Sequence, residues 1–158
     1  MNNLYIVIVE DQKEVLDAVS NDLSAFEDFC HLEECQEGEE AMEVMREIDE
    51  QGDLVAVLIT DHIMPGMTGV ELLTAIKGEP YVKATKKIML TGLATHEDTI
   101  NAINLGSIDR YIEKPWDKEE LTAVVRKLLT NFILESGMDY EQYMEYLDKP
   151  TLFKYLSG

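Results

Sequence analysis

The chain has 158 residues, which is enough for one domain and too few for two full ones. It carries 13 basic and 32 acidic residues, a net charge of −19 at pH 7, whereas proteins that bind nucleic acids directly present basic surfaces to the phosphates. No apolar run reaches the roughly 20 residues that span a membrane, and no basic residue precedes the first apolar run as it would in a signal peptide. We therefore expect a cytoplasmic protein whose own chain binds neither nucleic acid nor membrane.

Segments typical of strands and of helices alternate from residue 4 to residue 130. The expected strands are runs rich in apolar and β-branched residues at 4–9, 29–35, 54–60, 87–91 and 108–112, of which 29–35 is the most polar and is expected near an edge. After each strand, apolar residues recur at helical spacing, over residues 15–26, 41–48, 70–76, 95–106 and 121–129. This alternation predicts an α/β fold, a doubly wound five-stranded parallel sheet with helices on both faces.

The two cysteines, Cys30 and Cys35, are five positions apart in the second expected strand. An odd separation places them on opposite faces, about 16 Å apart at about 3.3 Å per residue. We therefore expect no disulfide between them, because that distance is well beyond the span of a disulfide. We expect packing or surface thiols, with redox sensing as the alternative.

Polar side chains follow four of the expected strands. Glu10 and Asp11 come directly after the first strand, Asp61 after the third, Thr91 ends the fourth, and Lys114 lies just past the fifth. Because the carboxyl ends of parallel strands meet at one edge of a sheet, where such folds bind ligands, these five side chains are expected to share one cleft.

This set of residue types is typical of phosphoryl chemistry. Three neighbouring carboxylates repel one another unless a cation is present, and a few oxygen ligands suit Mg²⁺, which keeps several waters. A carboxylate can also act as a nucleophile and form an aspartyl-phosphate. Asp61 is the best candidate because its strand is the most apolar, and Lys114 and Thr91 are placed to interact with phosphate oxygens.

Four segments resemble the receiver domain of two-component response regulators, the CheY-like family. They are Ile8–Asp11, Ile59–Gly69, Met89–Gly92 and Tyr111–Trp116, in that order over residues 4 to about 130. One such motif is weak evidence, but four in sequence, each at the expected strand end, are specific. The resemblance implies a flavodoxin-like fold and a place in phosphorelay signal transduction.

The resemblance also implies roles for individual residues. Asp61 would accept a phosphoryl group from a phosphohistidine on a sensor histidine kinase or a histidine phosphotransfer protein. Glu10, Asp11 and Asp61 would hold Mg²⁺ together with the backbone carbonyl of Ile63. Lys114 would pair with the phosphoryl oxygens, which makes the protein a phosphoprotein.

A conformational switch is implied as well. Thr91 would move toward the phosphate and Tyr111 would swing inward behind it, remodelling the face formed by the fourth helix, fifth strand and fifth helix, roughly residues 95–130. The protein would then be a signalling switch with autocatalytic phosphotransfer and dephosphorylation, and not an enzyme with a metabolic substrate. A homodimer through residues 95–130 or the C-terminal extension is an open alternative.

Other interpretations of these residues are also available. Taken singly, Asp11 is an ordinary helix cap, Thr91 an ordinary strand residue and Lys114 a solvated lysine. Haloacid-dehalogenase phosphatases require Asp-x-Asp, but this chain has Asp61-His62-Ile63. The cobalamin-binding motif Asp-x-His-x-x-Gly fails because His62 comes one position early, so we expect His62 to be a partly exposed neighbour of Asp61. A receiver-like scaffold that works without phosphorylation also stays open.

We divide the chain into a receiver domain at residues 1–130 and an aromatic-rich extension at 131–158. The extension holds six of the 12 aromatic residues, namely Phe132, Tyr140, Tyr143, Tyr146, Phe153 and Tyr155. Such density argues against a flexible linker, and the spacing predicts a short helix over 139–147 with Pro150 after it. Three roles stay open: packing on the receiver's own surface, contact with a partner or second copy, and the start of a longer regulator whose output domain is missing.

Overall fold

The computed structural model describes residues 2–92, 97 and 108–158, and within them it contains one five-stranded parallel sheet. The strands are β1 (Leu4–Val9), β2 (Cys30–Cys35), β3 (Leu54–Thr60), β4 (Lys86–Thr91) and β5 (Arg110–Glu113). Their order across the sheet is β2-β1-β3-β4-β5, and every neighbouring pair is parallel. The doubly wound fold is confirmed, and the polar strand β2 lies at an edge as expected.

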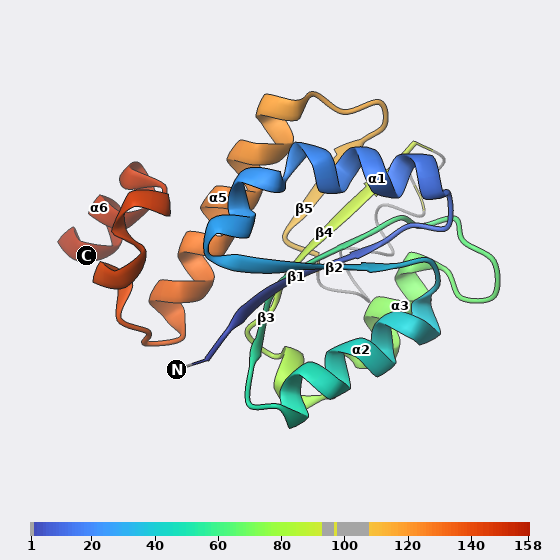
Figure 1. Cartoon of the computed structure of the whole chain (residues 1–158), viewed down its shortest axis with the longest axis horizontal. Helices are drawn as coiled ribbons and strands as arrows, with labels where there is room; N and C mark the ends of the chain where they lie inside the picture. Colours follow the sequence, from blue (N-terminus) through green and yellow to red (C-terminus); the bar gives the residue numbers. More distant parts are fainter. Residues whose placement is uncertain (1, 93–96, 98–107) are drawn as a thin grey trace.

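Helices cover both faces of this sheet (Figure 1). On one face lie α1 (Lys13–Asp22) and α5 (Lys118–Glu135), and on the other lie α2 (Gly38–Glu50) and α3 (Gly69–Ile76). Short 3-10 helices connect them, η1 at Ser24–Asp28 and η2 at Pro80–Val82. Because successive strand residues point to opposite faces, the sheet separates two apolar cores.

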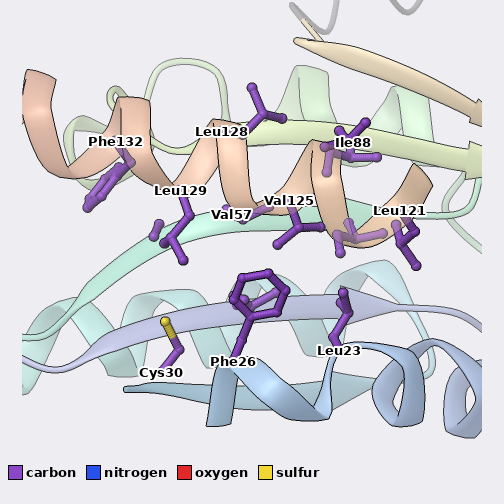
Figure 2. Packing of buried hydrophobic residues seen from close by; sticks show 14 of the residues in the cluster. Leu23, Phe26, Cys30, Val57, Ile88, Leu121, Val125, Leu128, Leu129 and Phe132 are labelled. Carbon is purple, nitrogen blue, oxygen red and sulfur yellow. The ribbon is translucent and has the colours of Figure 1, made fainter. Parts of the chain in front are cut away.

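The larger core lies between the sheet, the α1–η1 segment and α5 (Figure 2). Phe26 of η1 and Leu129 of α5 each expose 1% of their surface, and Val57 of β3 is fully buried. Leu4, Ile6 and Ile8 of β1 belong to this core, whereas Val7 and Val9 belong to the second core, under α2 and α3. Successive side chains of β1 therefore pack against different pairs of helices, one pair on each face of the sheet.

The cysteines occupy the two ends of β2, and each is buried in a different core. Cys30 lies in the core beside α5 and Cys35 in the core beside α2, so the expected opposite faces are confirmed. Burial raises the pKa of each thiol to about 12. Both residues are therefore protonated packing groups at neutral pH.

Some element boundaries differ from those expected. The first helical segment does not run to residue 26 as one helix: α1 ends at Asp22, and the chain continues as the 3-10 helix η1. Strand β5 begins at Arg110 and not at residue 108, and the helix expected over 95–106 lies outside the described residues except for Glu97. The helix expected over 121–129 is α5, which continues to Glu135, so the boundary that we expected at residue 130 falls inside it.

The C-terminal extension continues after α5 as a 3-10 helix, η4 (Tyr140–Tyr146), and a further helix, α6 (Lys149–Ser157). The first of these matches the short helix expected over 139–147. The second was not expected, because Pro150 indicated an end and instead lies in the first turn of α6. Proline is tolerated there since its missing N–H would have no intrahelical partner.

The extension packs on the surface of the chain itself. The ring of Tyr146 stacks on Phe29 with 4.1 Å between centroids, and its carbonyl oxygen accepts a 2.7 Å hydrogen bond from Arg126 of α5. The backbone N–H of Asp148 donates to Thr130 Oγ1 over 2.9 Å, and Leu152 of α6 is 1% exposed. None of the helices in the described part of the chain is long and apolar enough to cross a membrane.

The buried side chain of α6 provides a test of this packing. We expect Leu152→Ala to lower the free energy of unfolding by ~2–4 kcal/mol, because it removes apolar contacts and leaves a cavity. Leu156→Ala on the same helix is the matched control: Leu156 is 53% exposed, and its truncation should change stability by less than ~0.5 kcal/mol. Urea unfolding measures both, and equal values would mean that α6 does not pack as described.

Candidate functional site

Three carboxylates converge at the carboxyl edge of the sheet. Glu10, Asp11 and Asp61 each offer an oxygen, and these oxygens lie within 4.8 Å of one another. The neighbouring strand ends are held in register because the N–H of Asp61 donates to the carbonyl of Val9 over 3.0 Å. Glu10 and Asp61 are 3% and 8% exposed, so two of the three charges are largely removed from water.

The ammonium of Lys114, just past β5, lies between two of these carboxylates. It donates a hydrogen bond to Glu10 Oε1 and another to Asp61 Oδ2, the latter over 3.1 Å. The Lys114 side chain is only 21% exposed, so these contacts are shielded from solvent more than an ordinary surface pair. The sequence expectation that the ends of the first, third and fifth strands share one cleft agrees with this geometry.

Backbone amides orient the carboxylates further. The N–H of His62 donates to Asp61 Oδ1 over 2.7 Å, and the N–H of Gln12 donates to Glu10 Oε2 over 3.0 Å. Since Lys114 binds the other oxygen of each group, both carboxylates have one oxygen on a backbone amide and one on the ammonium. Their side chains are therefore held in fixed orientations.

Burial and charge act in opposite directions on the titrating groups. Burial is the main reason why the pKa of Glu10 is raised, and the neighbouring Asp61 carboxylate adds to the rise, although hydrogen bonds from Lys114 and Gln12 oppose it. Burial by itself would lower the pKa of Lys114, but its hydrogen bonds to Glu10 and Asp61 outweigh that effect, so the pKa is raised. The ammonium form of Lys114 is thus favoured.

Thr91 and Tyr111 lie beside this group on β4 and β5. Thr91 is buried at 1% exposure, and its backbone carbonyl accepts hydrogen bonds from the Tyr111 hydroxyl over 3.2 Å and from the Lys114 N–H over 3.3 Å. Tyr111 is half-buried, and burial raises the pKa of its hydroxyl. The backbone of Thr91, at the end of β4, therefore binds both Tyr111 and Lys114. Thr91 and Tyr111 are the two residues expected to act as the switch.

The loop after Asp61 corrects one expectation. His62 is 6% exposed and is not the partly exposed neighbour that the sequence indicated. The physical reason is that the loop folds back on itself: the N–H of Gly69 donates to the His62 carbonyl over 2.8 Å, which closes the loop. Ile63, two residues after Asp61, is the exposed one, at 44%.

Gly69 is a residue of this site that sequence reasoning missed. A Cβ at position 69 would lie 2.3 Å from the carbonyl oxygen of Asp61 and 3.0 Å from the Cα of His62. Only glycine allows the start of α3 to approach the backbone of Asp61 so closely. The available signal was a glycine at a fixed place after Asp61, but in the sequence alone it was indistinguishable from a loop glycine.

Comparisons with known proteins identify the family of the fold that carries this cluster of carboxylates and lysine. The family model of the response regulator receiver domain matches residues 6–126, which is most of the chain. The chain belongs to this family. Chemotaxis protein CheY-3 of Vibrio cholerae is 32% identical to this receiver domain over 130 residues, which cover 80% of this chain and 95% of that protein.

Two further relatives differ in how much they share with this receiver. The signal receiver domain of an HD domain-containing protein from Pseudomonas fluorescens Pf-5 has a TM-score of 0.74 at 27% identity and covers 87% of this chain and 94% of that one. The hydrogenase transcriptional regulatory protein HoxA of Cupriavidus necator is 34% identical over 84 residues, 53% of this chain and 17% of HoxA. This chain therefore spans only a small part of some of its relatives.

The contact at Gly69 predicts a large effect of one methyl group. Gly69→Ala should destabilise the receiver by ~1–3 kcal/mol, because backbone must shift to relieve the clash with Asp61. Gly78→Ala is the control: a Cβ there meets no atom within 4 Å, and its effect should stay within ~0.5 kcal/mol. Urea unfolding of both variants checks this, and a neutral Gly69→Ala would refute the close approach.

The raised pKa of Glu10 predicts a pH-dependent stability difference. Its ionised form is disfavoured in the fold, so metal-free Glu10→Gln should unfold at a higher temperature than the wild type at pH 7. The gain should disappear as the pH falls through the folded pKa of Glu10 toward its unfolded value near ~4.3, where the wild-type carboxyl is itself neutral.

The control for this comparison is Glu43→Gln, which removes one exposed charge from the middle of α2, away from the helix ends. It corrects for the lower net charge, and thermal unfolding from pH 4 to pH 8 measures all three proteins. A wild type as stable as Glu10→Gln at pH 7 would contradict the cost assigned to the buried charge.

Proposed function

We propose that this receiver domain is a phosphorylation switch in two-component signal transduction, with Asp61 as its phosphoryl acceptor. The observation that carries the proposal is the Lys114 ammonium, which contacts both Asp61 and Glu10 at the edge where β1 and β3 end. A buried carboxylate with an adjacent cation and two further carboxylates is the set that phosphoryl transfer to an aspartate requires.

The proposed transfer starts from a phosphohistidine on a sensor histidine kinase or a histidine phosphotransfer protein. An Asp61 oxygen forms a bond to phosphorus while the N–P bond breaks, and the imidazole leaves with the bonding electron pair and then takes up a proton. The protein contributes positioning and charge, because this chemistry needs little acid–base help. The backbone amide of His62, bound to Asp61 Oδ1, fixes the direction of the nucleophile.

Mg²⁺ is the cation we propose for the carboxylates. The donor set fits it, because Glu10, Asp11 and Asp61 offer only oxygen ligands in a small space, and the carbonyl of Ile63 would complete the protein's share. When bound, Mg²⁺ neutralises charge on the phosphoryl oxygens. Lys114 would move its hydrogen bond from Asp61 to a phosphoryl oxygen, which keeps its charge in the pocket.

The switch we propose runs through β4 and β5. Phosphoryl oxygens at Asp61 add negative charge and acceptors, which the Thr91 hydroxyl would satisfy while Tyr111 turns inward. Phosphorylation shifts the population of states only by its preference for one of them. The output face at residues 95–130 lies partly outside the described residues, and a homodimer through this face or through the extension is part of the proposal.

The proposed protein is a signalling switch and not an enzyme with a metabolic substrate. Its only chemistry would be the uptake of the phosphoryl group and its loss to water. We place it in the cytoplasm, where phosphohistidine donors of this kind act. The net charge of −19 supports a protein partner over direct contact with DNA, RNA or an anionic membrane.

One experiment decides the central point. The receiver, incubated with Mg²⁺ and a small phosphodonor such as acetyl phosphate, should gain the mass of one phosphoryl group in an intact-protein mass spectrum. Asp61→Asn should take up none, because the amide is not a nucleophile at phosphorus, and a chelator should abolish uptake by the wild type.

Asp28→Asn is the matched control, because Asp28 is exposed on η1, and it should be phosphorylated like the wild type. Uptake at full rate by folded Asp61→Asn would move the acceptor to another residue. No uptake by the wild type from either acetyl phosphate or a phosphohistidine donor would remove the proposed function.

A further inference from the structure

The single tryptophan of the chain connects the loop that carries Lys114 to the far end of α1. Trp116 is two residues after Lys114, and its indole Nε1–H donates a 2.8 Å hydrogen bond to Asp22 Oδ2. The rest of the ring packs against the larger apolar core. The bond therefore joins β5–α5 to α1, two parts of the chain that are 94 residues apart.

Besides the hydrogen bonds of the Lys114 ammonium, three hydrogen bonds hold the loop between β5 and α5, each with a different partner. Its first residue, Lys114, donates its backbone N–H to Thr91. Its last residue, Asp117, caps α5 by accepting the N–H of Glu120 over 3.2 Å. The third is the hydrogen bond from Trp116 to Asp22, which, among the described residues, is the hydrogen bond that joins this loop to α1.

Asp22 is poorly placed for helix stability, which makes its bond to Trp116 informative. It is the last residue of α1, where the helix dipole disfavours a carboxylate, and the last turn contains no basic residue. Among the described residues no ion pair involves Asp22. A hydrogen bond to a charged acceptor is stronger than one between neutral groups. The bond from the indole therefore offsets the unfavourable interaction between the Asp22 carboxylate and the helix dipole.

Helix α1 connects this bond to the carboxylates. It begins at Lys13, with Gln12 as its N-cap between the Glu10–Asp11 pair and the helix, and it ends at Asp22. One end of the helix is therefore set by the residues that face Lys114, and the other end holds the loop from which Lys114 projects. A displacement of Trp116 would move the lysine relative to its two carboxylate partners.

We propose that the Trp116–Asp22 hydrogen bond positions Lys114 for phosphoryl transfer to Asp61. Trp116 and Asp22 are positioning residues, because they act through Lys114 and touch neither the carboxylates nor the phosphoryl group. This inference rests on the proposed function of Asp61. It assigns a role in positioning Lys114 to the single tryptophan of the chain.

The test uses three single variants of the whole chain. Trp116→Phe keeps an aromatic ring and loses the N–H donor, Asp22→Ala loses the acceptor, and Asp22→Asn keeps an acceptor oxygen. At saturating acetyl phosphate and Mg²⁺, the first two should be phosphorylated about 5–10-fold more slowly than the wild type, since small misplacements of a catalytic group are costly. Asp22→Asn should stay within about twofold.

Two readouts separate positioning from a general structural effect. The double variant Trp116→Phe/Asp22→Ala should be no slower than either single variant, because both remove the same bond. The Lys114 side-chain NMR signal of the unphosphorylated protein should shift in both slow variants and return in Asp22→Asn.

Each outcome is decisive. Wild-type rates in Trp116→Phe and Asp22→Ala would overturn the inference, and so would a double variant that is clearly slower than both single variants. If the wild type takes up no phosphoryl group, the proposed function fails, and the Lys114 NMR signal still decides whether the indole bond places the lysine. An unchanged Lys114 signal in the two slow variants would reject that placement.

Discussion

The Lys114 ammonium between Glu10 and Asp61 is the contact on which the rest of the pocket depends. Without a cation at this point, two largely buried carboxylates would face each other at adjacent strand ends, where like charges repel more strongly than in water. Lys114 arrives from beyond β5, across the end of β4. The pocket therefore forms only when segments distant in sequence are aligned in one sheet.

The buried carboxylates of this site lower the stability of the fold, as is typical of a site that binds a ligand. Burial raises the pKa of Glu10 even though Lys114 and a backbone amide bind its carboxylate. A fold selected for stability alone would place apolar residues at these strand ends, as it does one residue earlier at Val9. Residues that lower stability locally are typical of functional positions. Here the two apolar cores on either side of the sheet offset the destabilisation by the buried Glu10 carboxylate.

The fold and the main site residues could be predicted because both follow from local patterns. Period and composition identify parallel strands, and parallel strands bring their carboxyl ends together, so Glu10, Asp61 and Lys114 could be grouped without coordinates. The role of Gly69, the burial of His62 and the hydrogen bond of Trp116 could not be predicted. Each depends on which distant segment lies against the residue, and no spacing along the chain encodes that.

Helix α5 links the two parts that the sequence separated. Its N-terminal end follows the loop of Lys114 and Trp116, and Arg126 and Thr130 farther along the helix bind the extension. Arg126 also lies over the ring of Phe26, 5.0 Å from its centroid, so the same side chain touches η1. The extension therefore packs against the same helix that begins after the loop of Lys114 and Trp116, and also against η1 through the stacking of Tyr146 on Phe29.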